Sequence, residues 1–161
     1  MTSFKNSFFI ALAAIDPNGV MGCKGKLPWH VPDDLAFFRK TTVPHTMVMG
    51  YDTYSSMPRR AFELRKSFVF TKKRRPVDPE LAISIASIDE LAEANPCYVI
   101  GGRKVFDLFF EKQRIDEALI THMHDCYEGD VFFDLKAIKN WPSIVILEHE
   151  QFTVRKYIRP K

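Results

Sequence analysis

The sequence lacks the features that would identify several common classes of protein. It has only three cysteines, Cys23, Cys97 and Cys126, without Cys-x-x-Cys spacing, which indicates free thiols in a reducing compartment rather than a disulfide framework. No stretch approaches the ~20 apolar residues of a membrane span. The formal net charge is only +3, too small for a bulk attraction to nucleic acid. We therefore expect a cytoplasmic monomer with no membrane or nucleic-acid partner.

Two fingerprints of catalytic or nucleotide sites are also missing. There is no G-x-G-x-x-G dinucleotide motif and no nucleophile elbow. One segment imitates a secretory signal, because the apolar run 8–15 follows Lys5. A single lysine makes a poor basic region, however, and the turn sequence at 16–19 ends the run. A buried strand explains this segment better.

The composition and the alternation of segments predict the fold class. With 161 residues, 46% of them apolar and 27% charged, the chain can form one domain spanning 1–161 with a core and a cleft. Apolar runs predict strands, and helical patterns alternate with the first five of them. The predicted strands are 8–15, 46–50, 67–71, 82–86, 97–101, 118–124, 143–149 and 152–158, and the predicted helices are 33–41, 52–57, 88–94 and 103–111. This pattern indicates an α/β domain with a mostly parallel central sheet, flanking helices and an antiparallel C-terminal hairpin.

The segment LPWHVPDDL at 27–35 places two adjacent carboxylates at the head of a predicted helix. At about 100° per residue, Phe38 lies about 40° from Asp34, whereas Asp33 lies about 100° away and leans toward Lys40. The helix dipole explains an acid such as Asp33. It does not explain Asp34, because an inward carboxylate loses hydration and needs a partner. A ligand that presents N–H groups would supply that partner, so Asp34 is a candidate binding residue.

Six segments extend this observation. They are ALAAIDPNGVMG, LPWHVPDDLAFF, TMVMGYDTYSSM, RKSFVFT, YVIGGRKVF and THMHDCYEGDVFF. In order and spacing, from about residue 8 to 134, they resemble the dihydrofolate reductase family. Leu-Pro-Trp followed by the helical acid is the specific element. The resemblance implies a dihydrofolate reductase-like fold and an enzyme that reduces 7,8-dihydrofolate to 5,6,7,8-tetrahydrofolate with NADPH, supplying one-carbon metabolism.

The resemblance also implies roles on the substrate side. Asp34 would grip the 2-amino group and N3 of the pterin, and Thr121 would share its hydrogen-bond network. Leu27 and Trp29 would belong to the loop that closes over the nicotinamide and excludes water. Arg65 would meet the α-carboxylate of the glutamate tail. The residues implied to line the pterin and aminobenzoyl slot are Leu12, Ala13, Leu35, Phe38, Met57, Phe62 and Ile100.

On the cofactor side, Gly101-Gly102 ends a predicted strand and opens a helix, whose free N–H groups would bind phosphate. In the family the peptide between these glycines is cis, although Gly-Gly alone indicates only a turn. Thr53 opens another predicted helix in the same way. The full implied cofactor set is Ala14, Met21, Gly22, Leu27, Gly50, Asp52, Thr53, Phe70, Thr71, Lys72, Lys73, Ile100, Gly101, Gly102, Arg103, Lys104, Val105 and Phe106.

The sequence departs from the family pattern in three places. Tyr51 stands where an Arg often helps to bind the 2′-phosphate, and we expect Lys72 and Lys73 to compensate, although such a basic run is also typical of a solvated turn. Phe106 replaces a Tyr whose hydroxyl lies near the nicotinamide. The segment before Arg65 lacks a Pro-Gly turn, which leaves the direction of its side chain open.

Three other interpretations of these residues compete with this one. A reductase of riboflavin biosynthesis shares the superfamily but generally lacks the Leu-Pro-Trp loop and the acid after it. A polyanion-binding protein that uses the basic run would show salt-dependent affinity and no NADPH oxidation. His122, His124 and Cys126 alternate along one predicted strand and share a face, but no fourth ligand is placed nearby, so we expect no metal.

Overall fold

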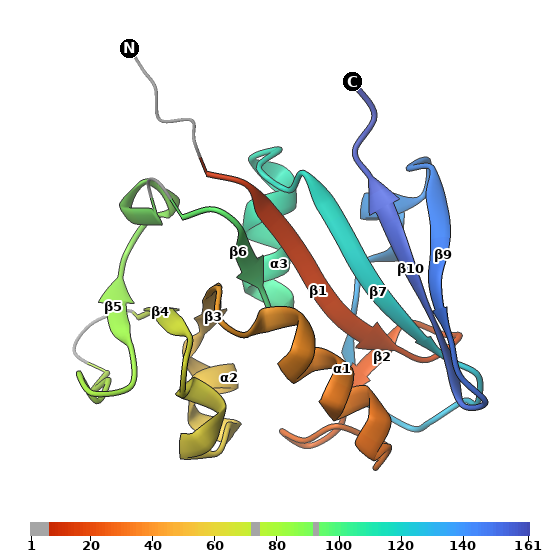
Figure 1. The fold of residues 1–161 in the computed structure, drawn as a ribbon, viewed down its shortest axis with the longest axis horizontal. Coiled ribbons are helices and arrows are strands. Elements are labelled where there is room, and N and C mark those ends of the chain that lie inside the picture. Colours follow the sequence, from red (N-terminus) through yellow and green to blue (C-terminus); the bar gives the residue numbers. More distant parts are fainter. Residues whose placement is uncertain (1–6, 72–74, 92–93) are drawn as a thin grey trace.

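An eight-stranded sheet runs through the molecule in the computed structural model, which describes residues 7–71, 75–91 and 94–161 (Figure 1). The strand order is β5-β4-β3-β6-β1-β7-β10-β9. All neighbours from β5 to β7 pair in parallel, and β10 is antiparallel to β7 and β9. The bounds are β1 Phe9–Ile15, β3 Thr46–Gly50, β4 Lys66–Phe70, β5 Ile83–Ile85, β6 Cys97–Val99, β7 Glu117–Met123, β9 Ser143–Glu148 and β10 Phe152–Ile158. The predicted mostly parallel sheet and antiparallel C-terminal hairpin are confirmed.

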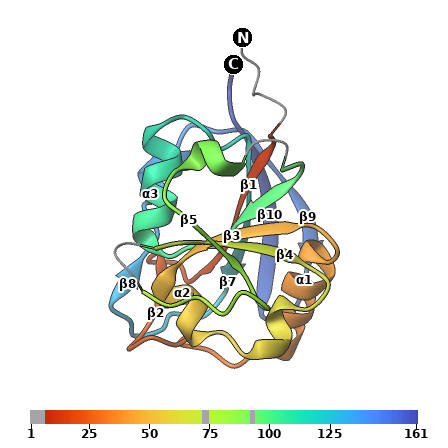
Figure 2. The same cartoon turned by 90° about the vertical axis from the view of Figure 1, so that its left-hand side faces the viewer.

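Helices cover both faces of this sheet. Figure 2 shows α1 (Pro32–Thr42) on one side and α3 (Arg103–Glu111) on the other, with α2 (Tyr51–Ser56) at one end of the sheet. Three 3-10 turns complete the helical elements: η1 Arg59–Phe62, η2 Ile88–Leu91 and η3 Leu135–Ile138. The predicted helix 88–94 is therefore a 3-10 turn over its described residues. None of the helices described in residues 7–71, 75–91 and 94–161 has the length and apolarity needed to cross a bilayer.

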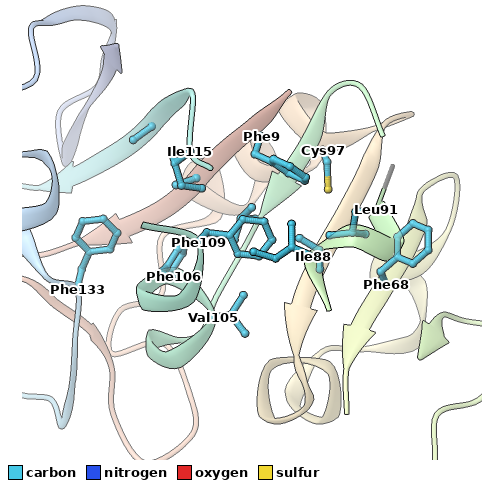
Figure 3. Close-up of a cluster of buried hydrophobic side chains, with 14 of the residues drawn as sticks. Phe9, Phe68, Ile88, Leu91, Cys97, Val105, Phe106, Phe109, Ile115 and Phe133 are labelled. Carbon is cyan, nitrogen blue, oxygen red and sulfur yellow. The ribbon is translucent and has the colours of Figure 1, made fainter. Parts of the chain in front are cut away.

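The position of strand β1 inside the sheet explains its uninterrupted apolar sequence. Successive side chains of a strand point to opposite faces. Phe9 packs in the cluster under α3, with its ring 5.1 Å from that of Phe109 (Figure 3). Ile10 and Leu12 point the other way and pack against Phe37 and Phe38 of α1. Both faces of β1 are thus buried, as the apolar run predicts.

Strand β9 shows where that inference is wrong. Its sequence is equally apolar, yet it is the last strand in the sheet order, and Ile144 is 58% exposed. Val145, Ile146 and Leu147 are also exposed. The register shifts beside Ile146, because Val154 pairs with Leu147 whereas Arg155 pairs with Val145. Such a bulge is one way in which proteins protect a sheet edge from further pairing.

A small second sheet, β2 (Val20–Gly22) with β8 (Val131–Phe132), was not predicted from the sequence. It follows a tight turn after β1 that is held by the fully buried carboxylate of Asp16. Oδ1 of Asp16 accepts hydrogen bonds from the backbone N–H groups of Asn18 and Val20, and Oδ2 accepts one from Tyr127. One carboxylate therefore fixes the direction in which the chain leaves the central strand.

We predict that Gly129→Ala destabilises the protein where the chain crosses β2. A Cβ at Gly129 would lie 2.3 Å from Cγ1 of Val20 and 2.6 Å from the carbonyl oxygen of Gly22. That oxygen is held in place because it accepts a hydrogen bond from the N–H of Asp130. Overpacking of this kind costs about 1–3 kcal/mol of unfolding free energy, which chemical denaturation will measure.

Gly25→Ala is the matched control. Gly25 has a φ of +80° and open space around it, so alanine there is strained by its backbone alone, which costs about 1 kcal/mol. A loss at Gly129 no larger than the loss at Gly25 would contradict the packing argument.

Candidate active site

Asp34 lies in the first turn of α1 with its side chain turned into the protein. It is 6% exposed, and Nε1 of Trp29 donates a hydrogen bond to its Oδ2 at 3.1 Å. The predicted inward orientation is confirmed. The expected partner, Thr121, is replaced by Trp29 as the hydrogen-bond donor seen within the described residues. A second carboxylate oxygen with free lone pairs still points to a ligand that donates hydrogen bonds.

The environment of Asp34 changes its proton affinity. Burial raises the pKa of this carboxyl above its ordinary value, and the hydrogen bond from Trp29 opposes that rise. The first effect is the larger because desolvation penalises the charged form more than one neutral donor stabilises it. A carboxyl with a raised pKa in a cleft is typical of a group that binds or exchanges protons.

Trp29 is itself held firmly. It is 7% exposed and packs with Val31, Met123, Phe152 and Val154. The loop before it is much more open, since Leu27 is 46% exposed. The Leu-Pro-Trp segment therefore has a fixed end at the indole and an open end toward the solvent.

Asp33 points outward, as the helical period predicts, with its side chain 70% exposed. Its Oδ2 accepts a hydrogen bond from Nε2 of His149 at 2.8 Å. His149 comes from the hairpin between β9 and β10. No sequence pattern linked this hairpin to α1.

The implied apolar slot is formed in large part. Phe38 and Ile100 lie against two neighbouring clusters, one built around Leu12 and one around Phe62 with Met57 beside it. Two implied members are placed differently. Leu35 is 50% exposed. Ala13 packs against the cluster under α3, on the other side of β1 from Leu12.

Thr121 is buried in β7, 2% exposed, and pairs with Ala14 of β1 and Val154 of β10. Its position in the middle of the sheet places it next to strand β1, near the carboxyl end from which the chain turns toward Trp29. The hydroxyl of Thr121 therefore lies inside the fold rather than at its surface.

Arg65 is also buried, 6% exposed, although it carries a charge. Its NH1 donates to Oγ1 of Thr42 at 3.0 Å, its Nε donates to the carbonyl oxygen of Glu63, and its guanidinium lies 5.9 Å from the ring of Phe38. Burial and the nearby charge of Arg39 lower its pKa. In the described part of the chain no carboxylate forms an ion pair with Arg65. A buried cation of this kind is prepared to bind an anion.

The backbones of Gly50, at the end of β3, and Gly101, after β6, pack against side chains of α3. The Gly101–Gly102 peptide is cis, as the family resemblance implies. The N–H of Gly50 donates to the carbonyl oxygen of Gly101 at 2.8 Å, which joins the ends of β3 and β6. A Cβ at Gly101 would lie 3.1 Å from Phe106, and one at Gly50 would lie 3.1 Å from Val105. These positions leave little room for any other residue.

Helices α2 and α3 begin directly at these glycines, Gly50 and Gly102, and neither helix has a side-chain cap. Their first N–H groups are therefore free to bind an anion. Oγ1 of Thr53 lies close to Gly102, 3.8 Å from where its Cβ would be. A hollow lies beside α2, lined by Gly25, Asp52, Ser55, Ser56, Asp130 and Val131.

Two charged residues implied on the cofactor side, Arg103 and Lys104, lie in the first turn of α3. Arg103 is bonded to Asp107 and to the carbonyl oxygen of Phe132, while Lys104 is exposed. The guanidinium of Arg75 lies 4.8 Å from the ring of Tyr51 and pairs with Asp52 at 3.5 Å. Nothing in the sequence indicates this contact.

Other implied cofactor residues lie on strands β2 and β4 and directly after β4. Gly22 and Met21 belong to β2, and Phe70 ends β4 with its ring against Phe109. Thr71 follows β4 and hydrogen-bonds Ser84. Lys72 and Lys73 lie outside the described residues.

His122 near the end of β7 and His124 just after it form hydrogen bonds with residues of β10. Nε2 of His122 meets the hydroxyl of Tyr157 at 2.8 Å, and Nε2 of His124 meets Oγ1 of Thr153 at 2.9 Å. Burial and the charge of Arg155 lower the pKa of His122. No cluster of three metal-ligating side chains occurs in the part of the chain that the structure describes.

Comparisons with known proteins show which family the chain matches. A family model described as dihydrofolate reductase matches residues 8–157. A dihydrofolate reductase of Bacillus subtilis is 34% identical over 137 residues, which cover 81% of this chain and 78% of that protein. The dihydrofolate reductase HdrB of Haloferax volcanii is 32% identical over 138 residues, 78% of this chain and 70% of that protein. The structure of dihydrofolate reductase from Enterococcus faecalis complexed with NADP(H) and RAB-propyl is similar with a TM-score of 0.80 at 29% identity, over 96% of this chain and 97% of that one.

We predict that Trp29→Phe raises the pKa of Asp34 further, because it removes the hydrogen bond that opposes the effect of burial. A raised pKa means that the folded state holds the proton more tightly than the unfolded chain. The stabilisation from Asp34 is therefore complete at low pH and is lost as the pH rises through the folded-state pKa. In Trp29→Phe this loss should occur at higher pH than in the wild type.

The measurement is the free energy of unfolding as a function of pH. Asp34→Asn should remove this pH dependence, and Asp33→Asn, which changes an exposed neighbour, should preserve it. If Trp29→Phe shifts the loss to lower pH, the indole does not stabilise the charged carboxylate.

Proposed function

The chain belongs to the dihydrofolate reductase family, and we propose from its geometry how its own residues perform the reaction of that family. The enzyme reduces 7,8-dihydrofolate to 5,6,7,8-tetrahydrofolate with NADPH. The observation that carries the assignment of roles is the buried carboxylate of Asp34, which accepts a hydrogen bond from Trp29 through Oδ2 and, among the described residues, has no donor to Oδ1.

Asp34 binds the 2-amino group and N3 of the pterin in this proposal. These two N–H donors match a carboxylate that accepts through both oxygens. Their binding holds the ring so that N5 takes a proton from water while C6 receives hydride. Burial raises the pKa of Asp34 above its ordinary value, and hydrogen bonds from the ligand's N–H groups favour the charged form that accepts them. Thr121 extends the network from β7.

The loop before α1 closes over the reacting carbons. Trp29 is the fixed end of this loop and Leu27 the open end. Closure of Leu27 over the nicotinamide would exclude water from the hydride path. We propose that Leu12, Phe38, Met57, Phe62 and Ile100 line the slot. Ala13 and Leu35, which the resemblance also implies, lie elsewhere in this structure.

Arg65 binds the α-carboxylate of the glutamate tail. Its guanidinium is buried and lacks an ion-pair partner among the described residues, yet it is held by Thr42 and by the ring of Phe38. The side chain is therefore positioned before the ligand arrives. Such preorganisation lowers the entropic cost of binding.

The cofactor side fits a dinucleotide with phosphates. The free first turn of α3 after Gly102, with the exposed ammonium of Lys104, favours a pyrophosphate. Thr53 and the backbone of Gly101 border the same space. When bound, NADPH supplies the hydride. Lys72 and Lys73 stay proposed contacts of the 2′-phosphate that lie outside the described residues. Arg75 lies against Tyr51 and pairs with Asp52 at 3.5 Å, at the start of α2.

Residues 1–161 are proposed to act as one domain. The near-neutral net charge of +3 favours an enzyme without a nucleic-acid partner. A cytoplasmic location and a monomeric state complete the proposal, and neither is needed for the chemistry described.

The function is tested by following NADPH absorbance with and without dihydrofolate. Asp34→Asn should keep the fold, because an amide is less costly to bury than an isolated carboxylate. Turnover should fall by a factor on the order of 10² or more, with partial recovery at low pH, where the substrate binds already protonated.

Asp33→Asn is the matched control for this test. It has the same chemistry one position earlier and still offers an oxygen to His149, so turnover should stay near wild type. NADPH oxidation that does not depend on dihydrofolate, or a harmless Asp34→Asn with a harmful Asp33→Asn, would overturn the assignment.

We predict that Arg65→Leu weakens dihydrofolate binding by about 2–4 kcal/mol, as expected when a buried anion loses its charged partner. NADPH affinity should hardly change. Binding of each ligand is measured separately by titration.

Thr42→Val is the control for this substitution. It removes the hydroxyl that Arg65 contacts at 3.0 Å but keeps the positive charge. If Thr42→Val costs as much dihydrofolate affinity as Arg65→Leu, or if NADPH affinity falls equally, then Arg65 acts by holding α1 rather than by binding the glutamate tail.

A further inference from the structure

The hairpin between β9 and β10 contacts the first turn of α1 across a wide gap in sequence. Nε2 of His149 lies 2.8 Å from Oδ2 of Asp33, and the two residues are 116 positions apart. Asp33 immediately precedes Asp34. The hairpin therefore contacts the helical turn that carries Asp34, the residue proposed to bind the pterin.

Both ring nitrogens of His149 have defined roles. Nδ1 accepts a hydrogen bond from the backbone N–H of Gln151 at 3.0 Å. In a neutral imidazole the other nitrogen then carries the proton, so Nε2–H donates to Asp33. The ring also stacks on Phe152, with centroids 4.4 Å apart and planes 8° apart. The imidazole is thus fixed in position and direction.

Phe152 connects this contact to the tryptophan beside Asp34. It is 1% exposed and belongs to the cluster that contains Trp29 and Val31. Val31 is the residue before α1. The support under His149 is therefore the same packed cluster that holds Trp29, the donor to Asp34.

Helix α1 has few other fixed points at this end. Val31 makes no side-chain capping hydrogen bond, and only Asp34 and Thr42 among the helix residues are buried. Phe37 and Phe38 are only partly buried against the sheet. Polar contacts near the ends of α1 must therefore contribute to its orientation.

We propose that His149 is a positioning residue for Asp34, acting through Asp33. Because Asp33 and Asp34 share one helical turn, a bond that fixes the first also fixes the rotation of the second about the helix axis. Loss of the bond loosens this turn and exposes Asp34. The role in turnover rests on the proposed function of Asp34, whereas the effect on the position of Asp34 does not.

The first test needs no ligand and uses Trp29 as a probe. In a Trp141→Phe background Trp29 is the remaining tryptophan, since the sequence has two, and its fluorescence should titrate with the carboxyl that its indole contacts. Asp34→Asn in the same background identifies that transition by removing it. His149→Phe keeps a ring to stack on Phe152 but lacks the donor to Asp33.

The expected result is a shift of the transition to lower pH by roughly half a unit in His149→Phe, because a more exposed carboxyl loses part of the desolvation that raises its pKa. His149→Gln, which retains an N–H donor, should recover part of the shift. Asp33→Ala should match His149→Phe, and the double variant should be no worse than either, as for two residues that act through one contact.

His124→Phe is the matched control. His124 also bonds the hairpin, through the carbonyl oxygen of Glu150 at 3.0 Å and the hydroxyl of Thr153, but it directly follows β7, and none of its hydrogen bonds within the described residues goes to α1. It should lower stability without moving the transition. A transition unchanged in His149→Phe, or moved equally in His124→Phe, overturns the proposal.

The second test measures kinetics on the same variants. His149→Phe should lower kcat/KM for dihydrofolate by roughly 3- to 10-fold, a modest misplacement effect, with the KM for NADPH unchanged. If Asp34→Asn proves fully active, the proposed function of Asp34 fails, and the fluorescence transition alone still decides whether His149 positions it. A shifted transition with unchanged kinetics overturns the catalytic part of the proposal.

Discussion

The burial of one carboxylate is the constraint on which the rest of the site depends. Asp34 is removed from water and, within the part of the chain that the structure describes, receives one side-chain hydrogen bond, from Trp29. A charge in such a place is costly unless a partner compensates it, and the described neighbours leave that compensation incomplete. The cost is tolerable because it belongs to a binding site: the ligand's N–H groups complete what the fold leaves open. The loop with Trp29 and the first turn of α1 are arranged to keep Asp34 in this state.

The sheet provides the rigid frame that makes this possible. Strand β1 is covered on both faces, by α3 through Phe9 and by α1 through Leu12. Its chain then turns under the control of Asp16 and leads to the Leu-Pro-Trp loop. Strand β6 lies beside β1 and β3 lies beside β6, and the glycines from which α2 and α3 begin follow at their carboxyl ends. Ligands of open α/β sheets bind at this edge, outside the carboxyl ends of the strands.

Much of this frame could be predicted from the sequence, because it rests on local patterns. Apolar runs marked all eight strands of the main sheet, and the 3.6-residue period placed Asp34 inward. The failures share a physical cause. Nothing in the run 143–149 reveals that β9 lies at an edge, since exposure depends on which strand pairs last. The short strands β2 and β8 carry too few residues to show a period. The partners of Asp33 and Arg75 were missed because His149 and Tyr51 reach them only through the tertiary fold.

The two halves of the site are held by different forces, and this difference bears on how each tolerates change. On the substrate side, α1 is fixed by polar contacts at both ends, Asp34 with Trp29 and Thr42 with Arg65. Such contacts can be weakened singly, and the loss appears as a changed pKa or direction while the core stays packed. On the cofactor side, the backbone of Gly101 packs against the ring of Phe106, 3.1 Å from where a Cβ would lie. Phe106 is 3% exposed and its ring meets Phe133 edge to face, so this residue, which lacks the hydroxyl usual in the family, acts here as a core side chain. Single substitutions along α1 can therefore change the chemistry of the site while the fold stays intact. Substitutions at the glycines that precede α2 and α3 disturb the packing of the fold as well.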